Sequence, residues 1–117
     1  MPFITFEGID GSGKSTLIKK LAQRLKDLGR KLEVTREPGG TPLGHDLRTI
    51  LLRTDGAVPC PEAELLIYEA DRAQHVQTKI KPLLQQGVWV ISDRHSDSSL
   101  AFQGDGRRIA LEDVKWL

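Results

Sequence analysis

Near its N-terminus the chain reads Gly8-Ile9-Asp10-Gly11-Ser12-Gly13-Lys14-Ser15, which fits the pattern G-x-x-x-x-G-K-[ST]. A short apolar and β-branched run, residues 2 to 7, comes directly before this stretch, and a helical pattern begins directly after it near Lys14. Apolar residues recur on one face of that helix until Leu28, and Gly29 then ends it. The stretch therefore predicts a strand, a glycine-rich turn and an amphipathic helix in direct succession.

The same stretch predicts a site for the phosphates of a nucleoside triphosphate. Its glycines let backbone amides approach phosphate oxygens without interference from a Cβ, and the helix start adds unpaired N–H groups and a favourable dipole. Lys14 would neutralise the β and γ phosphates, and the hydroxyl of Ser15 would ligate magnesium. The alternative is a glycine-rich turn that carries a solvated lysine.

Further strands and helices follow along the chain. Residues 31 to 35 read as a second strand, and the continuous apolar run at 88 to 91 is typical of a strand buried on both faces of a parallel sheet. Helical patterns cover residues 46 to 53 and about 62 to 86, where Pro82 is expected to bend or break the last turns. Residues 36 to 44, rich in proline and glycine, are expected to form a functional loop. A short helix over 97 to 103 and another from about residue 111 are also expected.

This order of elements predicts an α/β protein with the three-layer P-loop NTPase fold, a parallel sheet, and ligand sites at the carboxyl ends of the strands. Three strands make a thin sheet for this class. We therefore expect residues 1–117 to be the N-terminal part of a larger P-loop kinase domain, whose lid and C-terminal strands are absent.

The composition indicates an ordinary globular domain: 38% of the residues are hydrophobic, 28% are charged, and the net charge is +1. Such a balance creates no strong field, so we expect neither a nucleic acid nor a membrane as a partner. The single cysteine, Cys60, has no partner for an internal disulfide, and no apolar run is long enough to span a bilayer. The N-terminus shows no signal-peptide pattern, and a cytoplasmic location is therefore expected.

Two charged pairs are further candidates. Asp93-Arg94 follows the third predicted strand, where the aspartate can hold magnesium and the arginine can clamp a second phosphate; the alternative is a surface ion pair. Tyr68 and Arg72 are spaced i and i+4 on the long helix and suit a flat ligand such as a base. The alternative for them is a cation–aromatic contact on a solvated face. His75, on the same helix, is expected to be a polar surface residue.

Four segments, in this order, make the chain resemble the thymidylate kinases. They are Phe6 to Thr16, Thr35-Arg36-Glu37-Pro38-Gly39-Gly40-Thr41, Ala70-Asp71-Arg72-Ala73-Gln74-His75, and Ser92-Asp93-Arg94 with Asp97-Ser98-Ser99-Leu100-Ala101-Phe102-Gln103-Gly104. The first is shared by P-loop kinases in general, whereas the second and fourth are much more specific. The resemblance implies that the γ-phosphoryl group of ATP is transferred to dTMP with Mg²⁺, giving dTDP, by a homodimer with five-stranded sheets.

The resemblance also implies roles for individual residues. ATP phosphates and magnesium would be bound by Gly8, Asp10, Gly11, Ser12, Gly13, Lys14, Ser15 and Thr16. The dTMP site would comprise Asp10 near the sugar hydroxyl, Arg48 and Arg94 at the phosphate, Tyr68 stacked on thymine, and Arg72, Ser99 and Gln103 at the base. Asp93, with Ser15, would lie at the magnesium ion, and Glu37 would face a closing lid. Lys14, Asp93 and Arg94 form the expected catalytic set.

Two positions depart from the family pattern. Ser12 stands where some members have arginine, and His95 replaces a more frequent tyrosine. The alternatives are a kinase for another nucleoside monophosphate, a nucleotide-binding module that is inactive as truncated, and a P-loop switch. The switch would need a guanine-specific Asn-Lys-x-Asp run, which the sequence lacks. For the kinase we expect in-line attack by an acceptor phosphate oxygen, which is already anionic and needs no general base.

Overall fold

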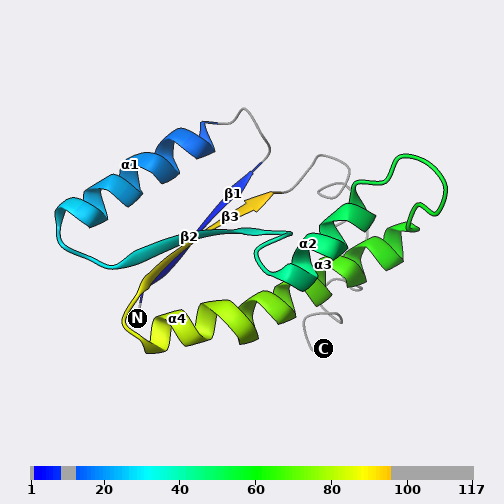
Figure 1. The fold of residues 1–117 in the computed structure, drawn as a ribbon. Helices are drawn as coiled ribbons and strands as arrows, with labels where there is room; N and C mark the ends of the chain where they lie inside the picture. The colour runs from blue at the N-terminus through cyan, green and yellow to red at the C-terminus, as the bar shows by residue number, and fades with distance from the viewer. Residues whose placement is uncertain (1, 9–12, 96–117) are drawn as a thin grey trace.

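The computed structural model describes residues 2–8 and 13–95, and its elements follow the predicted order (Figure 1). The expected helices at 97 to 103 and from about 111 lie outside the described residues. The elements are β1 (Phe3–Gly8), α1 (Lys14–Asp27), β2 (Leu32–Glu37), α2 (Pro42–Leu51), α3 (Pro61–His75), the π-helical segment η1 (Val76–Ile80), α4 (Lys81–Gln85) and β3 (Trp89–His95).

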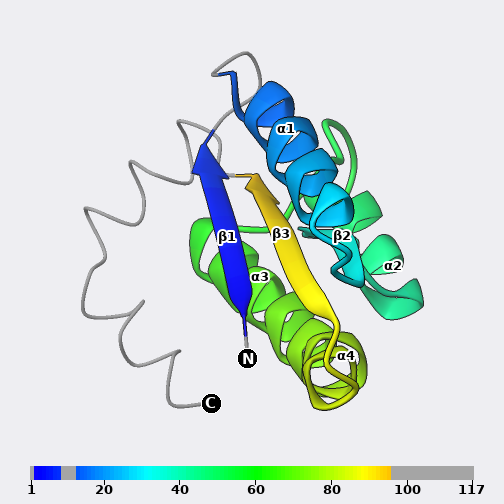
Figure 2. The ribbon, with the colours of Figure 1, turned by 90° about the vertical axis from the view of Figure 1, so that its left-hand side faces the viewer.

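The three strands form one parallel sheet in the order β1-β3-β2, which confirms the predicted parallel sheet (Figure 2). The last strand in the sequence is therefore the central one. Val90, Ile91 and Ser92 of β3 are completely buried, as expected for a strand covered on both faces. The carboxyl ends of all three strands point to the same edge, where ligands bind in open α/β sheets.

Helices cover both faces of this sheet, so the three-layer architecture is confirmed (Figures 1 and 2). On one face lies α1, whose apolar residues at a spacing of three and four are turned inward. Ile18, Ala22 and Leu25 of α1 form the core cluster with Ile91 of β3. On the other face lie α3, η1 and α4.

The stretch expected to be a long loop, residues 36 to 44, is mostly regular structure, and that prediction was wrong. Strand β2 continues to Glu37, and α2 begins at Pro42. Proline is favoured in the first turn of a helix, where its missing N–H would have no partner anyway. Thr41 caps the helix, because its Oγ1 accepts a hydrogen bond of 2.9 Å from the backbone N–H of Gly44. Only four residues, 38 to 41, connect the two elements.

The long helix from about 62 to 86 is interrupted before Pro82 rather than at it. The ladder changes to π-helical over Val76–Ile80 and becomes α-helical again at Lys81. Proline has no N–H to donate to the preceding turn, so the turn before it must rearrange. The predicted disturbance is therefore present, and it occurs one turn earlier than expected.

Candidate active site

The central strand β3 runs to His95, so Asp93 and Arg94 lie inside the strand and not after it. This corrects the predicted strand end at residue 91. In the sheet register Asp93 is opposite Phe6 and Arg36, whereas Arg94 is opposite Glu7 and Glu37. Successive side chains of a strand point to opposite faces. Asp93 therefore belongs to the face covered by α1, and Arg94 belongs to the face covered by α3.

On the α1 face the ammonium group of Lys14 lies among three oxygen atoms at the carboxyl edge of the sheet. Its Nζ is 2.7 Å from Oδ1 of Asp93, 2.8 Å from the carbonyl oxygen of Gly8 and 3.3 Å from that of Arg94. Lys14 is buried, whereas Asp93 retains 34% exposure. The prediction that these two residues belong to one site agrees with this contact.

The start of α1 supplies the remaining phosphate-loop residues that the structure describes. Gly13 precedes the helix with a φ of 83°, a left-handed conformation that glycine adopts without strain. Ser15 and Thr16 follow in the first turn and are exposed. The exposed Ser15 and Thr16 thus lie beside Lys14 at the start of a helix, a position that suits an anionic ligand. Asp10, Gly11 and Ser12 lie outside the described residues.

On the α3 face the carboxylate of Glu37 is shared by three side chains. Its Oε1 is 3.0 Å from Nε of Arg72 on α3 and 3.3 Å from Nε of Arg94 on β3. Its Oε2 is 2.7 Å from Nδ1 of His75. Arg94 also reaches Oε1 of Glu7 with Nη1 at 3.2 Å, so this guanidinium lies between glutamates of the two flanking strands. Glu37 is 5% exposed, and the lid that it was expected to face is a segment expected to be absent from residues 1–117, so that role stays a prediction.

The expectation that His75 is a surface residue was wrong. Its side chain has no exposed area, and Nε2 lies 2.7 Å from Oγ1 of Thr35. On β2, Thr35 and Glu37 are two residues apart and point to the same face of the sheet. The imidazole therefore bridges them from α3. The spacing of Thr35 and Glu37 could have indicated that they share a face of the strand, but no motif marks the two residues as functional.

Burial and charge act against each other on the carboxyl groups of this face. Burial raises the pKa of Glu37, but hydrogen bonds from His75 and Arg72 and the charges of Arg72 and Arg94 outweigh it. The pKa of Glu37 therefore lies below its usual value, and the group is ionised at neutral pH. For Asp71 burial is the larger influence and raises the pKa, although Oδ1 accepts a hydrogen bond of 3.1 Å from the Gly39 N–H.

The turn between β2 and α2 is held by contacts on both sides. Asp71 holds it from α3 through Gly39, and Arg48 of α2 donates from Nη1 to the carbonyl oxygen of Pro38 at 3.1 Å. Arg48 is thus attached to this turn. Tyr68 is half-buried on α3, one turn before Arg72, so the predicted pair shares a helix face. Ser99 and Gln103, the other residues expected at the base, lie outside the described residues.

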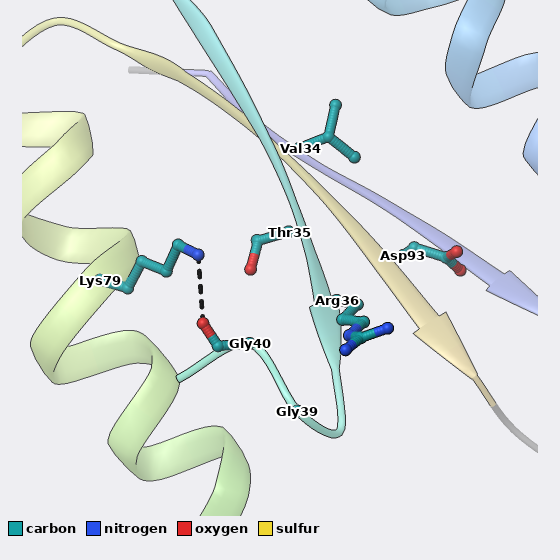
Figure 3. Close-up of a pocket in the computed structure, with 7 residues that line it drawn as sticks. All are labelled: Val34, Thr35, Arg36, Gly39, Gly40, Lys79 and Asp93. Atoms are coloured by element: carbon teal, nitrogen blue, oxygen red, sulfur yellow. Dashed lines mark hydrogen bonds between the residues drawn. The ribbon is translucent and has the colours of Figure 1, made fainter. Parts of the chain in front are cut away.

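A hollow of about 300 Å³ borders the edge strand β2. Figure 3 shows Val34, Arg36 and Asp93 on one side of this strand, and Thr35 with Lys79 on the other. The Nζ of Lys79 donates to the carbonyl oxygen of Gly40 at 3.1 Å. The picture makes the division into two faces visible, because the side chains of β2 alternate between them.

No helix among the described residues combines the length and the apolar character that crossing a membrane requires.

Three residues that hold the α3 face together, Thr35, Asp71 and His75, were not among the predicted site residues. Asp71 and His75 are spaced i and i+4, which places them on one helix face. That spacing was a usable signal for a buried polar face on α3.

Comparison with known proteins agrees with this arrangement. The sequence model of the family described as "Thymidylate kinase" matches residues 6–116. A thymidylate kinase of Synechococcus sp. (strain WH7803) is 60% identical over 90% of this chain and 52% of its own length. One from Bdellovibrio bacteriovorus is 51% identical over the whole chain and 55% of its own length.

A solved structure is also similar to this chain. The crystal structure of thymidylate kinase from Ehrlichia chaffeensis superposes with a TM-score of 0.77 at 42% identity, over 98% of this chain and 65% of that one. The chain spans about half the length of the curated relatives it matches. The matched family region includes every predicted site residue of the described structure. The chain belongs to the thymidylate kinase family.

Proposed function

We propose that the protein transfers the γ-phosphoryl group of ATP to dTMP, giving ADP and dTDP. The observation that carries this proposal is the position of Lys14. Its Nζ forms an ion pair with the side chain of Asp93 and a hydrogen bond to the backbone carbonyl of Arg94. Lys14, the group for the donor phosphates, thus lies on one face of β3. Arg94, the group for the acceptor phosphate, lies on the other face of the same strand. The two phosphates could meet at this edge of the sheet.

On the α1 face the residues fit a bound triphosphate. Lys14 exchanges its protein oxygen partners for phosphate oxygens, and the exposed N–H groups at the start of α1 supply further donors. Asp93 is partly exposed beside Lys14, and the Ser15 hydroxyl is exposed one residue further on. This pair of oxygen donors suits Mg²⁺, which takes few protein ligands. When bound, the ion neutralises charge on the triphosphate.

On the α3 face the residues fit a nucleoside monophosphate. A guanidinium has five N–H donors, and Glu37 engages only Nε of Arg72 and of Arg94. Donors that remain can bind the phosphate through Arg94 and a ring carbonyl through Arg72. Arg48 is attached to the turn beside them. Tyr68 supplies an aromatic ring one helical turn from Arg72, a combination that suits a base.

The chemistry requires positioning and charge stabilisation. An oxygen of the dTMP phosphate attacks the γ-phosphorus, and the bond from that phosphorus to the oxygen bridging to the β-phosphate breaks in line. The attacking oxygen carries a negative charge before the reaction, so no side chain has to remove a proton. Lys14 stabilises the charge that develops on the leaving diphosphate, and Arg94 orients the attacking phosphate.

A coupled assay of ADP release tests the proposal. ATP and Mg²⁺ are supplied with dTMP, dUMP, dGMP, dAMP or dCMP in turn, for this chain and for a full-length protein that contains it. We expect dTMP to give the highest rate in the full-length protein. A higher rate with another monophosphate would identify a different kinase, and no release with any of them would contradict phosphoryl transfer.

Two further expectations remain proposals. We propose a homodimer, which is supported by exposed apolar side chains on and between α2 and α3: Leu43, Leu52, Val58 and Leu66. Sedimentation equilibrium tests it, and a monomer at micromolar concentration would contradict it. We also propose a cytoplasmic location, because Cys60 is exposed and unpaired, as is usual in a reducing compartment.

A further inference from the structure

We propose that His75 and Thr35 are positioning residues for the nucleotide on the α3 face: they orient the carboxylate of Glu37, which in turn holds Arg72 and Arg94. The inference rests on the proposed function, because the two arginines are the groups offered to dTMP. Neither His75 nor Thr35 is expected to touch the substrate. They would act entirely through Glu37.

The geometry forms a chain of contacts from the interior to the arginines. Oγ1 of Thr35 lies 2.7 Å from Nε2 of His75, and Nδ1 of His75 lies 2.7 Å from Oε2 of Glu37. The other carboxylate oxygen, Oε1, is the one that both arginines approach. His75 is completely buried, and Thr35 and Glu37 are nearly so. Oε2 of Glu37 thus contacts His75, whereas Oε1 contacts the two arginines.

The chemistry of the groups assigns the proton on Nδ1 of His75. Glu37 pairs with two guanidinium groups and is an acceptor, so Nδ1 of His75 is the donor to it. In the neutral imidazole Nε2 is then an acceptor, and the hydroxyl of Thr35 donates to it. Every polar atom of the relay is satisfied in this tautomer. A rotation of the carboxylate would break the His75 bond and leave a buried oxygen unpaired.

The backbone packs closely against the relay. A Cβ built on Gly40 would lie 2.7 Å from Nε2 of His75, 2.7 Å from Oγ1 of Thr35 and 2.6 Å from the carbonyl oxygen of Arg36. The absence of a side chain at this position therefore lets the turn after β2 cover the relay. With His75 and Thr35 held under this turn, Oε2 of Glu37 bonds to His75 and Oε1 faces the arginines.

Two substitutions of His75 separate its two contacts. The amide nitrogen of asparagine lies at the position of Nδ1, so His75→Asn keeps a donor to Glu37. The amide of glutamine reaches the position of Nε2, so His75→Gln keeps only the contact to Thr35. We expect His75→Gln to raise the KM for dTMP about tenfold and His75→Asn to raise it less than about threefold. The KM for ATP should stay within about twofold in both, and His45→Gln, at an exposed position on α2, is the matched control.

Equal dTMP KM values for the two His75 variants, or equal rises for dTMP and ATP, would overturn the proposal. Far-ultraviolet circular dichroism identifies a variant that fails to fold. In that case Thr35→Val and Thr35→Ser provide the same contrast, since only serine keeps the hydroxyl; equal dTMP KM values for them overturn the proposal as well. Thr49→Val on the surface of α2 is the control, because its hydroxyl donates to the carbonyl oxygen of His45 in its own helix.

A double-mutant cycle with Glu37→Gln tests the route of action. If His75 acts through Glu37, His75→Gln should change dTMP binding less than about twofold once Glu37 is replaced. Additive effects would contradict this. Calorimetry of dTMP binding separates this inference from the proposed function. A wild-type protein that binds dTMP but transfers no phosphoryl group contradicts the transfer alone, whereas one that does not bind dTMP contradicts both.

Discussion

The two faces of β3 differ in how their polar groups are assembled. On the α1 face, Lys14 comes from one continuous motif, and its partners from outside that motif are two neighbouring residues of β3, Asp93 and Arg94. On the α3 face, Glu37 of β2 is contacted by side chains of both α3 and β3. A triphosphate can be held by a local turn, because its oxygens accept hydrogen bonds from consecutive backbone amides. An arrangement that must orient two arginines needs side chains from several elements.

The faces also differ in how much water reaches Asp93 and Glu37, the carboxylates that pair with Lys14 and with the two arginines. Asp93 is 34% exposed, so the loss of Lys14 would leave a carboxylate that water can solvate. Glu37 is buried, and the loss of its partners would leave a buried charge without compensation. Substitutions on the α1 face should therefore affect activity more than stability. Substitutions on the α3 face should affect both.

The largest expected effect is on activity and concerns Lys14. In a full-length protein, Lys14→Ala should lower dTMP-dependent ADP release about 10²–10³-fold, because a positive charge aimed at the developing phosphate charge is lost. The free energy of unfolding should fall by no more than about 1–2 kcal/mol, because the carbonyl oxygens of Gly8 and Arg94 lose a donor while Asp93 becomes accessible to water. Lys20→Ala, at an exposed position on α1, is the control. Turnover close to that of the wild type would show that Lys14 does not act in phosphoryl transfer.

The second effect is on stability and concerns Glu37. Glu37→Gln should lower the free energy of unfolding by about 1–3 kcal/mol at pH 7, as measured by urea denaturation. Because the folded-state pKa of Glu37 is lowered, its contribution is fully present above the usual glutamate pKa of 4.5 and is lost as the pH falls through the lower folded value. The difference between the two proteins should therefore shrink below about pH 4.5.

A suitable control for that measurement is Glu7→Gln. Glu7 also pairs with Arg94, but it is 65% exposed, and its replacement should change stability by less than about 0.5 kcal/mol. If the two glutamates had equal effects, burial would not be what distinguishes the α3 face.

The third prediction concerns the turn that covers the α3 face. Gly40→Ala should destabilise the protein by about 1–3 kcal/mol, because its Cβ would meet the backbone carbonyl of Arg36 as well as the side chains of His75 and Thr35. Dissociation of dTMP should also become faster. Gly56→Ala is the comparison: its φ is 66°, so alanine is strained there, but among the described residues no atom beyond its chain neighbours lies within 4 Å of the added Cβ. It should destabilise the protein and leave dTMP binding unchanged.

The smallest effect concerns the cap of α2. Thr41→Ala should reduce the free energy of unfolding by about 1 kcal/mol, since the N–H of Gly44 loses its acceptor. Thr41→Ser keeps an oxygen at that position and should recover most of the loss. Thermal unfolding followed by circular dichroism measures both variants, and identical midpoints for them would show that the cap contributes nothing.

The sequence was sufficient for the fold and for the α1 face. The period of apolar residues located α1, and the continuous apolar run at 88 to 91 located the third strand, whose burial on both faces the structure confirms. Element ends were less accurate. The polar residues Arg36, Glu37, Asp93 and Arg94 were assigned outside the strands, yet neighbouring strands continue the hydrogen-bonded ladder through them. The local sequence pattern does not show how far a strand continues when its hydrogen bonds are made with another strand more than fifty residues away.

The α3 face was predicted only in part, and His75 shows why. Its polarity argued for a surface position, and the carboxylate that permits its burial comes from a strand 38 residues earlier. A histidine can be buried when both ring nitrogens have partners, and those partners are visible only in the folded arrangement. Asp71 was quoted as part of a family segment without a role for the same reason. Its contact with Gly39 depends on the turn after β2.

The most direct test of the division between the two faces is calorimetry on Glu37→Gln in a full-length protein. The dissociation constants of dTMP and of a non-hydrolysable ATP analogue are measured side by side with those of the wild type. We expect dTMP to bind at least about tenfold more weakly, and the ATP analogue to stay within about twofold, because Glu37 acts only on the α3 face. Equal weakening of both nucleotides, or of the ATP analogue alone, would contradict the account.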